Sequence, residues 1–98
     1  MEELPLLLTI TTPDETRSVR CDAVSFTVPD SVDHPHAGGS IGIRRGHIDA
    51  LMAVAAGQVV ARAAGTPVLT AAVDAGFAVV RQDTVTILTD RADLTTSA

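Results

Sequence analysis

Short apolar segments alternate with turn signals through the second half of the chain, and their spacing constrains the fold more than any other feature. Residues 67–73, 77–81 and 84–89 are rich in Val, Ala, Thr or Ile, a composition that β-strands favour. Asp occurs in both intervening segments, 74–76 and 82–83, where it favours tight turns. Several strands at this regular spacing predict an all-β fold, either a sandwich or a barrel.

Two further strands are predicted in the first third of the chain. Residues 4–11 form an apolar run that ends at a Pro-Asp turn signal. Farther on, Val24, Phe26 and Val28 alternate with small or polar residues, which places three bulky side chains on one face of a strand. Strand-like alternation of this kind places four residues in the expected core, namely Phe26, Phe77, Val85 and Ile87.

Burial of Phe77 would make the Phe77→Ala substitution cost about 3–5 kcal/mol of stability.

Residues 46–65 leave two alternatives open. Helical spacing of apolar residues, in a stretch rich in the strong helix former Ala, favours a helix. Gly57 and the β-branched pair Val59-Val60 oppose a helix and favour two short strands, 51–54 and 58–63, with a turn between them. The apolar residues at helical spacing are Ile48, Leu51, Met52 and Ala55.

The whole chain is expected to form one domain, because 98 residues are too few for two hydrophobic cores. Residues 30–40 contain almost no apolar bulk and include two adjacent glycines, so an exposed loop is predicted there. The last residues are mostly small and polar. We therefore expect the β-sandwich or barrel domain over residues 1–93 and a frayed tail over residues 94–98.

Composition restricts the class of partner. The chain carries 12 acidic and 7 basic residues, for a formal charge of −5, and every basic residue is Arg. This acidic balance disfavours nucleic-acid binding, which depends on neutralising phosphates. Two Phe and no Tyr or Trp argue against a deep ligand pocket, since aromatic side chains supply much of the lining of such pockets. A broad, flat contact with another protein fits better.

Cysteine usage and the N-terminus indicate the compartment. Cys21 is the only cysteine, which excludes an intrachain disulfide and is typical of a reducing environment. Glu2 and Glu3 stand where a secretory signal would carry positive charge, and the apolar run at residues 4–8 is too short to span a membrane. We expect a soluble, cytosolic chain with no direct membrane insertion.

Catalytic and metal-binding motifs are not recognisable in the sequence. Residues 39–47 are glycine-rich, but they lack the Gly-Lys-Ser/Thr ending of a phosphate-binding loop. His34 and His36 flank a proline, yet no third and fourth ligand follow at a recognised spacing. We expect a chain that is not an enzyme, with no catalytic residue, cofactor or metal. The alternative hypothesis is a free-standing β-sandwich module that binds a metal or small ligand through the His34–His36 loop.

The order and spacing of residues 39–51 carry a family resemblance. Glycines stand at positions 39, 42 and 46, and His47 and Leu51 follow. This pattern resembles the segment G-E-x-G-[IV]-x-P-G-H-x-P-L-[LM] of the epsilon subunit of bacterial rotary (F-type) ATP synthases. Residues 74–79 and 83–92 are similar to the family's segments G-G-[FI]-x-x-V and N-x-V-T-[IV]-L-A-D-x-A. The likeness covers residues 4–93.

The resemblance implies a β-sandwich of about ten strands, with strands in place of a helix over residues 46–65. It also implies a non-catalytic subunit at the foot of the central stalk, which binds the gamma subunit on one side and the c-ring on the other. Such a subunit couples proton or sodium flow to ATP synthesis, in a peripheral complex on the cytoplasmic side of the plasma membrane.

Several features depart from the family pattern. Ser40 replaces an acidic residue, and Arg45 replaces a proline. We therefore expect either that Arg44 and Arg45 contact the ring in place of an acid, or that the ring loop carries a different charge. The sequence ends close to the end of the sandwich, so the C-terminal two-helix domain of the family, with its inhibitory or ATP-binding role, is expected to be absent. The candidate c-ring contacts are Gly39, Ser40, Gly42, Arg44, Arg45, Gly46 and His47.

Overall fold

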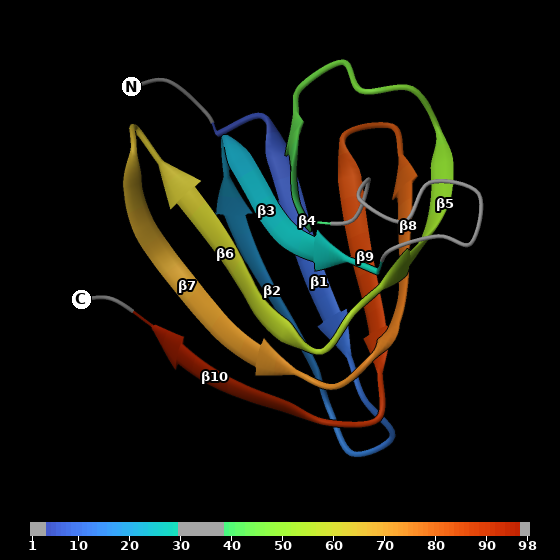
Figure 1. Cartoon of the computed structure of the whole chain (residues 1–98). Helices are drawn as coiled ribbons and strands as arrows, with labels where there is room; N and C mark the ends of the chain where they lie inside the picture. The colour runs from blue at the N-terminus through green and yellow to red at the C-terminus, as the bar shows by residue number, and fades with distance from the viewer. Residues whose placement is uncertain (1–3, 30–38, 97–98) are drawn as a thin grey trace.

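The computed structural model describes residues 4–29 and 39–96, and these residues form ten β-strands without a helix (Figure 1). The predicted all-β fold is therefore confirmed. The strands are β1 (Leu6–Thr11), β2 (Thr16–Cys21), β3 (Ala23–Val28), β4 (Gly39–Arg44), β5 (Ala50–Val54), β6 (Gly57–Ala63), β7 (Thr66–Val73), β8 (Gly76–Arg81), β9 (Thr84–Thr89) and β10 (Ala92–Thr96).

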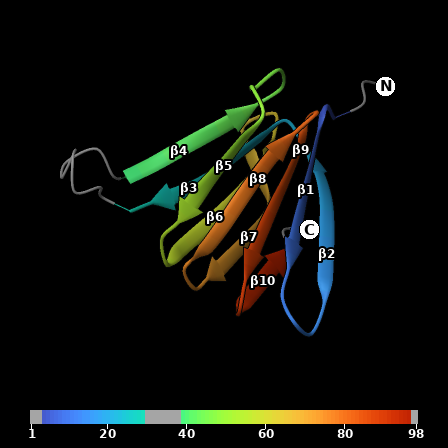
Figure 2. The same ribbon diagram turned by 90° about the vertical axis from the view of Figure 1, so that its right-hand side faces the viewer.

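The strands form two sheets of five. Sheet A has the order β2-β1-β9-β8-β5, and sheet B has the order β10-β7-β6-β3-β4. Neighbouring strands run antiparallel, apart from the parallel pair β1 and β9. Figure 2 shows the two sheets stacked face to face. The fold is thus the sandwich, and not the barrel, of the two architectures that the strand spacing allowed.

The core fills the space between the sheets with the inward-facing residues of both. Strand β1 alternates strictly, with Leu6, Leu8 and Ile10 buried and the residues between them partly exposed. Such alternation is expected where one face of a sheet is covered. Burial of Phe26, Val85 and Ile87 confirms three of the four predicted core positions.

The prediction for Phe77 was wrong, because its side chain is 56% exposed. On β8 the inward positions belong to Ala78 and Val80, which are buried. Phe77, Val79 and Arg81 follow one another at intervals of two residues, so all three share the outward face of β8. The charge of Arg81 was the signal for this register, since a buried arginine would need a partner.

Residues 46–65 contain strands and no helix. Strand β5 pairs with β8, and β6 pairs with both β3 and β7. In β6 the buried residues are Val59 and Ala61, two positions apart, so a period of two overrides the helical spacing upstream. The link between the strands is held by a hydrogen bond from the Ala55 N–H to the Thr27 carbonyl at 2.9 Å.

The C-terminal segment differs from the expected frayed tail. Strand β10 extends to Thr96 and pairs with β7, and Leu94 lies opposite Ala71. The reason is that Leu94 is partly buried against the core, so ordering of the backbone is offset by burial of an apolar side chain. The predicted exposed loop lies largely outside the described residues, as do His34, His36 and the last two residues of the tail.

Candidate functional site

The candidate ring-contact segment folds as strand β4 and the turn that follows it. Strand β4 is the edge strand of sheet B and pairs with β3, so that Ser40 lies opposite Thr27 and Arg44 lies opposite Ala23. At about 3.4 Å per residue, Ser40 and Arg44 are roughly 14 Å apart along the strand. The structure therefore divides the seven candidate ring contacts into two groups. The residues along the strand are Gly39, Ser40 and Gly42, and those at its far end are Arg44, Arg45, Gly46 and His47.

The turn after β4 is tied to the β8–β9 turn. The Gly46 N–H donates a hydrogen bond to Asp83 Oδ1 at 2.9 Å, and the His47 N–H donates to the Arg44 carbonyl at 3.2 Å. Gly46 has φ = +82°, a conformation that glycine adopts without steric cost. The glycine and the aspartate together fix where this turn projects from the sandwich.

A second contact holds the two turns together from the other side. The Gln82 N–H donates to Asp49 Oδ1 at 3.4 Å. Gln82 and Asp83 both have positive φ, at 49° and 61°, as the two central residues of a type I′ hairpin turn do. Sequence reasoning identified this pair as a turn but missed its role as the support of the Arg45–His47 turn, because a contact between distant segments leaves no local pattern.

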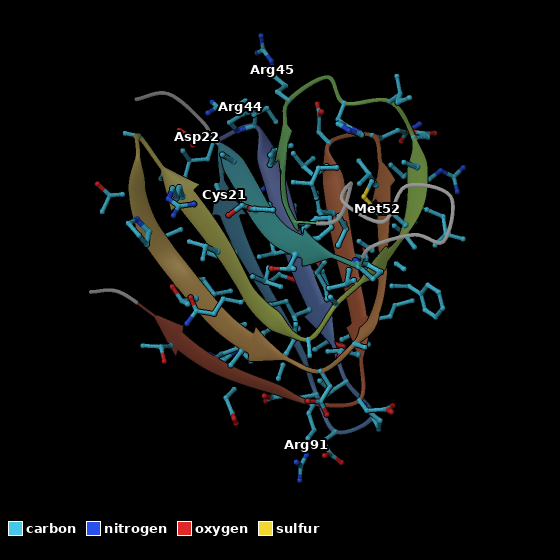
Figure 3. All side chains as sticks on the ribbon, in the orientation of Figure 1. Cys21, Asp22, Arg44, Arg45, Met52 and Arg91 are labelled. Atoms are coloured by element: carbon cyan, nitrogen blue, oxygen red, sulfur yellow. The ribbon has the colours of Figure 1, made fainter. Side chains whose placement is uncertain are left out.

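The arginines of the segment point into solvent. Arg44, Arg45, Ser40 and Gly42 are all exposed, and Figure 3 shows Arg45 extending away from the end of the sandwich. Within residues 4–29 and 39–96 no three His, Cys, Asp or Glu side chains are placed to hold a metal ion. The segment presents exposed polar and charged groups, and this arrangement suits contact with another macromolecule.

The outer face of sheet A carries large apolar side chains in water. Leu51 is 71% exposed on β5, Phe77 56% on β8 and Leu88 42% on β9. Register places Ala53, Phe77 and Leu88 in one row across three strands, and Leu51 beside Val79 in the next row. We call these five residues the apolar face. Sequence reasoning missed it, although the outward position of Arg81 on β8 would have revealed it.

A shallow groove of about 460 Å³ lies at one end of the apolar face. Phe77 and Leu88 form one wall, and the β1–β2 turn with Pro13 forms another. The groove adds concave apolar surface next to the exposed Phe77 ring and Leu88 methyl groups. Such a surface suits a protruding apolar side chain of another protein.

Cys21 is fully buried. Burial raises the pKa of its thiol, and the negative charge of Asp22 raises this pKa further. Because the thiolate is the reactive form, this residue is suited to packing and not to nucleophilic chemistry.

No helix in the described part of the chain is long and apolar enough to cross a membrane.

Comparison with known proteins identifies the family. The family model for the β-sandwich domain of the ATP synthase delta/epsilon chain matches residues 6–95. A chain in the cryo-EM structure of the Euglena gracilis mitochondrial ATP synthase, which contains OSCP, F1 and the c-ring, is similar in fold with a TM-score of 0.71 and 23% identity. The match covers 93% of this chain and 54% of that chain.

A second similar structure is a chain of the Tetrahymena thermophila mitochondrial ATP synthase, from its central stalk and c-ring. The TM-score is 0.63 and the identity 13%, over 98% of this chain and 69% of that chain. No curated protein matches the chain in sequence. The chain spans about half the length of the Euglena protein. The family match over nearly the whole sequence and the ten-stranded sandwich agree, and the chain belongs to the ATP synthase delta/epsilon-chain β-sandwich family.

Proposed function

We propose that this chain is a non-catalytic subunit of the central stalk of a rotary ATP synthase. In this role it attaches the gamma subunit to the c-ring and couples proton or sodium flow to ATP synthesis. The single observation that carries the proposal beyond family membership is the apolar face of sheet A. An exposed cluster of Leu51, Phe77 and Leu88 is unfavourable in water and is typical of a surface that a partner covers.

The gamma subunit is assigned to the apolar face. Obligate contacts within stable assemblies are more apolar than the rest of a protein surface and are centred on large side chains. On the described surface the exposed Leu and Phe side chains lie in sheet A, and the single exposed Ile lies in the turn beside it. Gamma is a partner that stays bound through rotation, so it requires this kind of surface.

The c-ring is assigned to strand β4 and its turn. Ser40 and Arg44 lie roughly 14 Å apart along one edge strand. We therefore expect the contact with the ring to extend along the strand. The exposed guanidinium groups of Arg44 and Arg45 would supply charge-assisted hydrogen bonds to ring loops. In this arrangement the chain is peripheral, on the cytoplasmic side of the membrane.

Reconstitution tests this proposal. The chain is mixed with the gamma subunit and then with the detergent-solubilised c-ring of the same organism, and complexes are separated by size exclusion at moderate salt. The proposal expects a one-to-one complex with gamma that also retains the ring. The double substitution Arg44→Glu/Arg45→Glu should release the ring, keep gamma bound and leave the melting temperature within a few degrees, because exposed charges contribute little to folding. Wild-type chain that elutes as a monomer beside gamma would refute the proposal.

A further inference from the structure

Next to the apolar face, one row of residues crosses sheet A from strand to strand and has an arginine at each of its two ends. Arg20 lies opposite Leu7, Leu7 lies opposite Thr84, and Thr84 lies opposite Arg81. The row thus crosses four adjacent strands, β2, β1, β9 and β8, and its two arginines are about 14 Å apart at 4.8 Å per strand. Both arginines are exposed. Arg81 follows Phe77 and Val79 on the outward side of β8, so the row is continuous with the apolar face.

Three carboxylates that the structure describes at this end of the sandwich accept hydrogen bonds from backbone amides. Asp22 Oδ2 accepts a hydrogen bond from the Ala64 N–H at 2.7 Å. Asp83 and Asp49 accept from the Gly46 and Gln82 N–H groups. The acids therefore hold the turns in place, and the neighbouring arginines are left without a carboxylate partner among residues 4–29 and 39–96.

Among residues 4–29 and 39–96, charge is distributed unequally between the two ends of the sandwich. Five of the seven arginines lie at the end just described, which is the upper end in Figure 1. The opposite end holds the ion pair of Arg17 Nη1 with Glu15 Oε2 at 4.0 Å, and Figure 3 shows Arg91 there. The arginines of the first end are Arg20, Arg44, Arg45, Arg62 and Arg81, and the acids of the opposite end are Asp14, Glu15, Asp74, Asp90 and Asp93.

We propose that Arg20 and Arg81 bind carboxylates on the partner that covers the apolar face, and that they thereby fix its orientation on sheet A. This inference rests on the proposed function, under which that partner is the gamma subunit. Two guanidinium groups at one border of an apolar surface admit a partner in one direction only, because the reversed orientation would place its acids against the acidic end. Charged groups at the rim of an interface act in this way on register and partner choice.

A carboxylate-bearing protein is favoured over an anionic lipid by what surrounds the two arginines. Between them lie Leu7 and Thr84, both partly buried in the sheet surface, and below them lies the apolar face. A flat sheet of this kind packs against another protein surface over a wide area. The guanidinium fork also matches a carboxylate in a bidentate geometry.

Charge reversal with a matched control gives the first test. The variants are Arg20→Glu/Arg81→Glu in the row and Arg17→Glu/Arg91→Glu at the opposite end, which change the net charge equally. The row variant should raise the Kd for gamma by about tenfold or more. It should also abolish the increase of this Kd with salt concentration that the wild type shows. The control variant should leave the Kd within about twofold. Equal weakening by both variants, or by neither, would overturn the inference.

Zero-length cross-linking gives a site-specific second test, because the chain contains no lysine. Arg20→Lys and Arg81→Lys each introduce one side-chain amine and keep the positive charge, and Arg91→Lys serves as the control. A carbodiimide couples an amine to a carboxylate that it already contacts. The inference expects an amide between position 20 or 81 and an Asp or Glu of gamma, identified by mass spectrometry, and none from position 91.

The outcomes separate this inference from the proposed function. Failure of the wild-type chain to bind gamma refutes the function itself. Gamma binding that survives the row variant, with no cross-link from positions 20 and 81, refutes only the arginine row. Cross-links to c-ring subunits, or binding of the wild type to vesicles with anionic phospholipid that the row variant loses, would reassign the arginines to the ring or to the membrane surface and overturn the inference.

Discussion

The two outer faces of the sandwich are built by the same alternation but carry different side chains. Sheet A presents Leu51, Phe77 and Leu88 to solvent. On the described part of sheet B no large apolar side chain is exposed, and the outward positions include Ser25, Val60 and Thr70. Both faces cover one shared core, so stability does not require large apolar groups on either. The difference therefore marks sheet A as the face that a partner covers.

The two phenylalanines provide the largest test of this comparison, because they carry the same side chain in opposite settings. Phe26 is 1% exposed in the core and Phe77 is 56% exposed on the apolar face. Phe26→Ala should lower the free energy of unfolding by about 3–5 kcal/mol through lost burial and a cavity. Phe77→Ala should lower it by less than about 1 kcal/mol. Urea denaturation of the two variants measures both values, and equal losses would place Phe77 in the core after all.

Affinity for gamma provides the next test. Leu51→Ala/Phe77→Ala should raise the Kd by roughly 30-fold, since truncation of central apolar anchors commonly costs about 2 kcal/mol or more. Thr27→Ala/Thr70→Ala on sheet B is the matched control and should leave the Kd within about twofold. Isothermal titration calorimetry measures both. A larger loss of affinity from the sheet B pair would show that our proposal places gamma on the wrong face.

Support of the Arg45–His47 turn by Asp83 predicts a smaller effect. Asp83→Gly suits the positive φ of this position but removes the acceptor of the Gly46 N–H bond. It should lower stability by about 0.5–1.5 kcal/mol and accelerate hydrogen exchange at the Gly46 amide. Asp83→Asn retains a side-chain oxygen and should change the exchange rate less. Unchanged exchange in both variants would show that the hydrogen bond does not hold the turn.

The buried thiol predicts the smallest effect, confined to high pH. The pKa of Cys21 is raised in the folded chain above its ordinary value of 9.0, so the unfolded chain loses this proton first. Stability from the protonated thiol is fully present below pH 9 and decreases above it, by at most about 1.4 kcal/mol per pH unit. The difference in unfolding free energy between wild type and Cys21→Ala, followed from pH 7 to 10.5, isolates this contribution. A difference that stays constant with pH would contradict it.

Sequence reasoning predicted most of the fold because strand signals are local. Alternation around Phe26 and turn residues such as Asp74 declare themselves within a few positions. Strand β2 was missed, since residues 16–21 contain two arginines and little apolar character. Its position comes from pairing with β1 at the sheet edge, a tertiary effect that local propensity does not record.

The candidate site was predicted less completely, because sites depend on register. The glycine and histidine spacing in residues 39–47 identified the segment, but the length of β4 separates Ser40 from Arg45. The apolar face was missed because alternation assigned Phe77 to the core, although alternation alone does not say which face of a strand is covered. The row of Arg20 and Arg81 combines residues 61 positions apart in the sequence, and only the sheet register brings them together.

The most direct test of the central claim is a methyl NMR titration of the chain with the gamma subunit. The methyl groups of Leu51, Val79 and Leu88 report on the outer face of sheet A, and those of Val60 report on the outer face of sheet B. Our account predicts that the sheet A signals shift or broaden at one equivalent of gamma, while the Val60 signals stay unchanged. Changes at Val60 with unchanged signals from sheet A would contradict it.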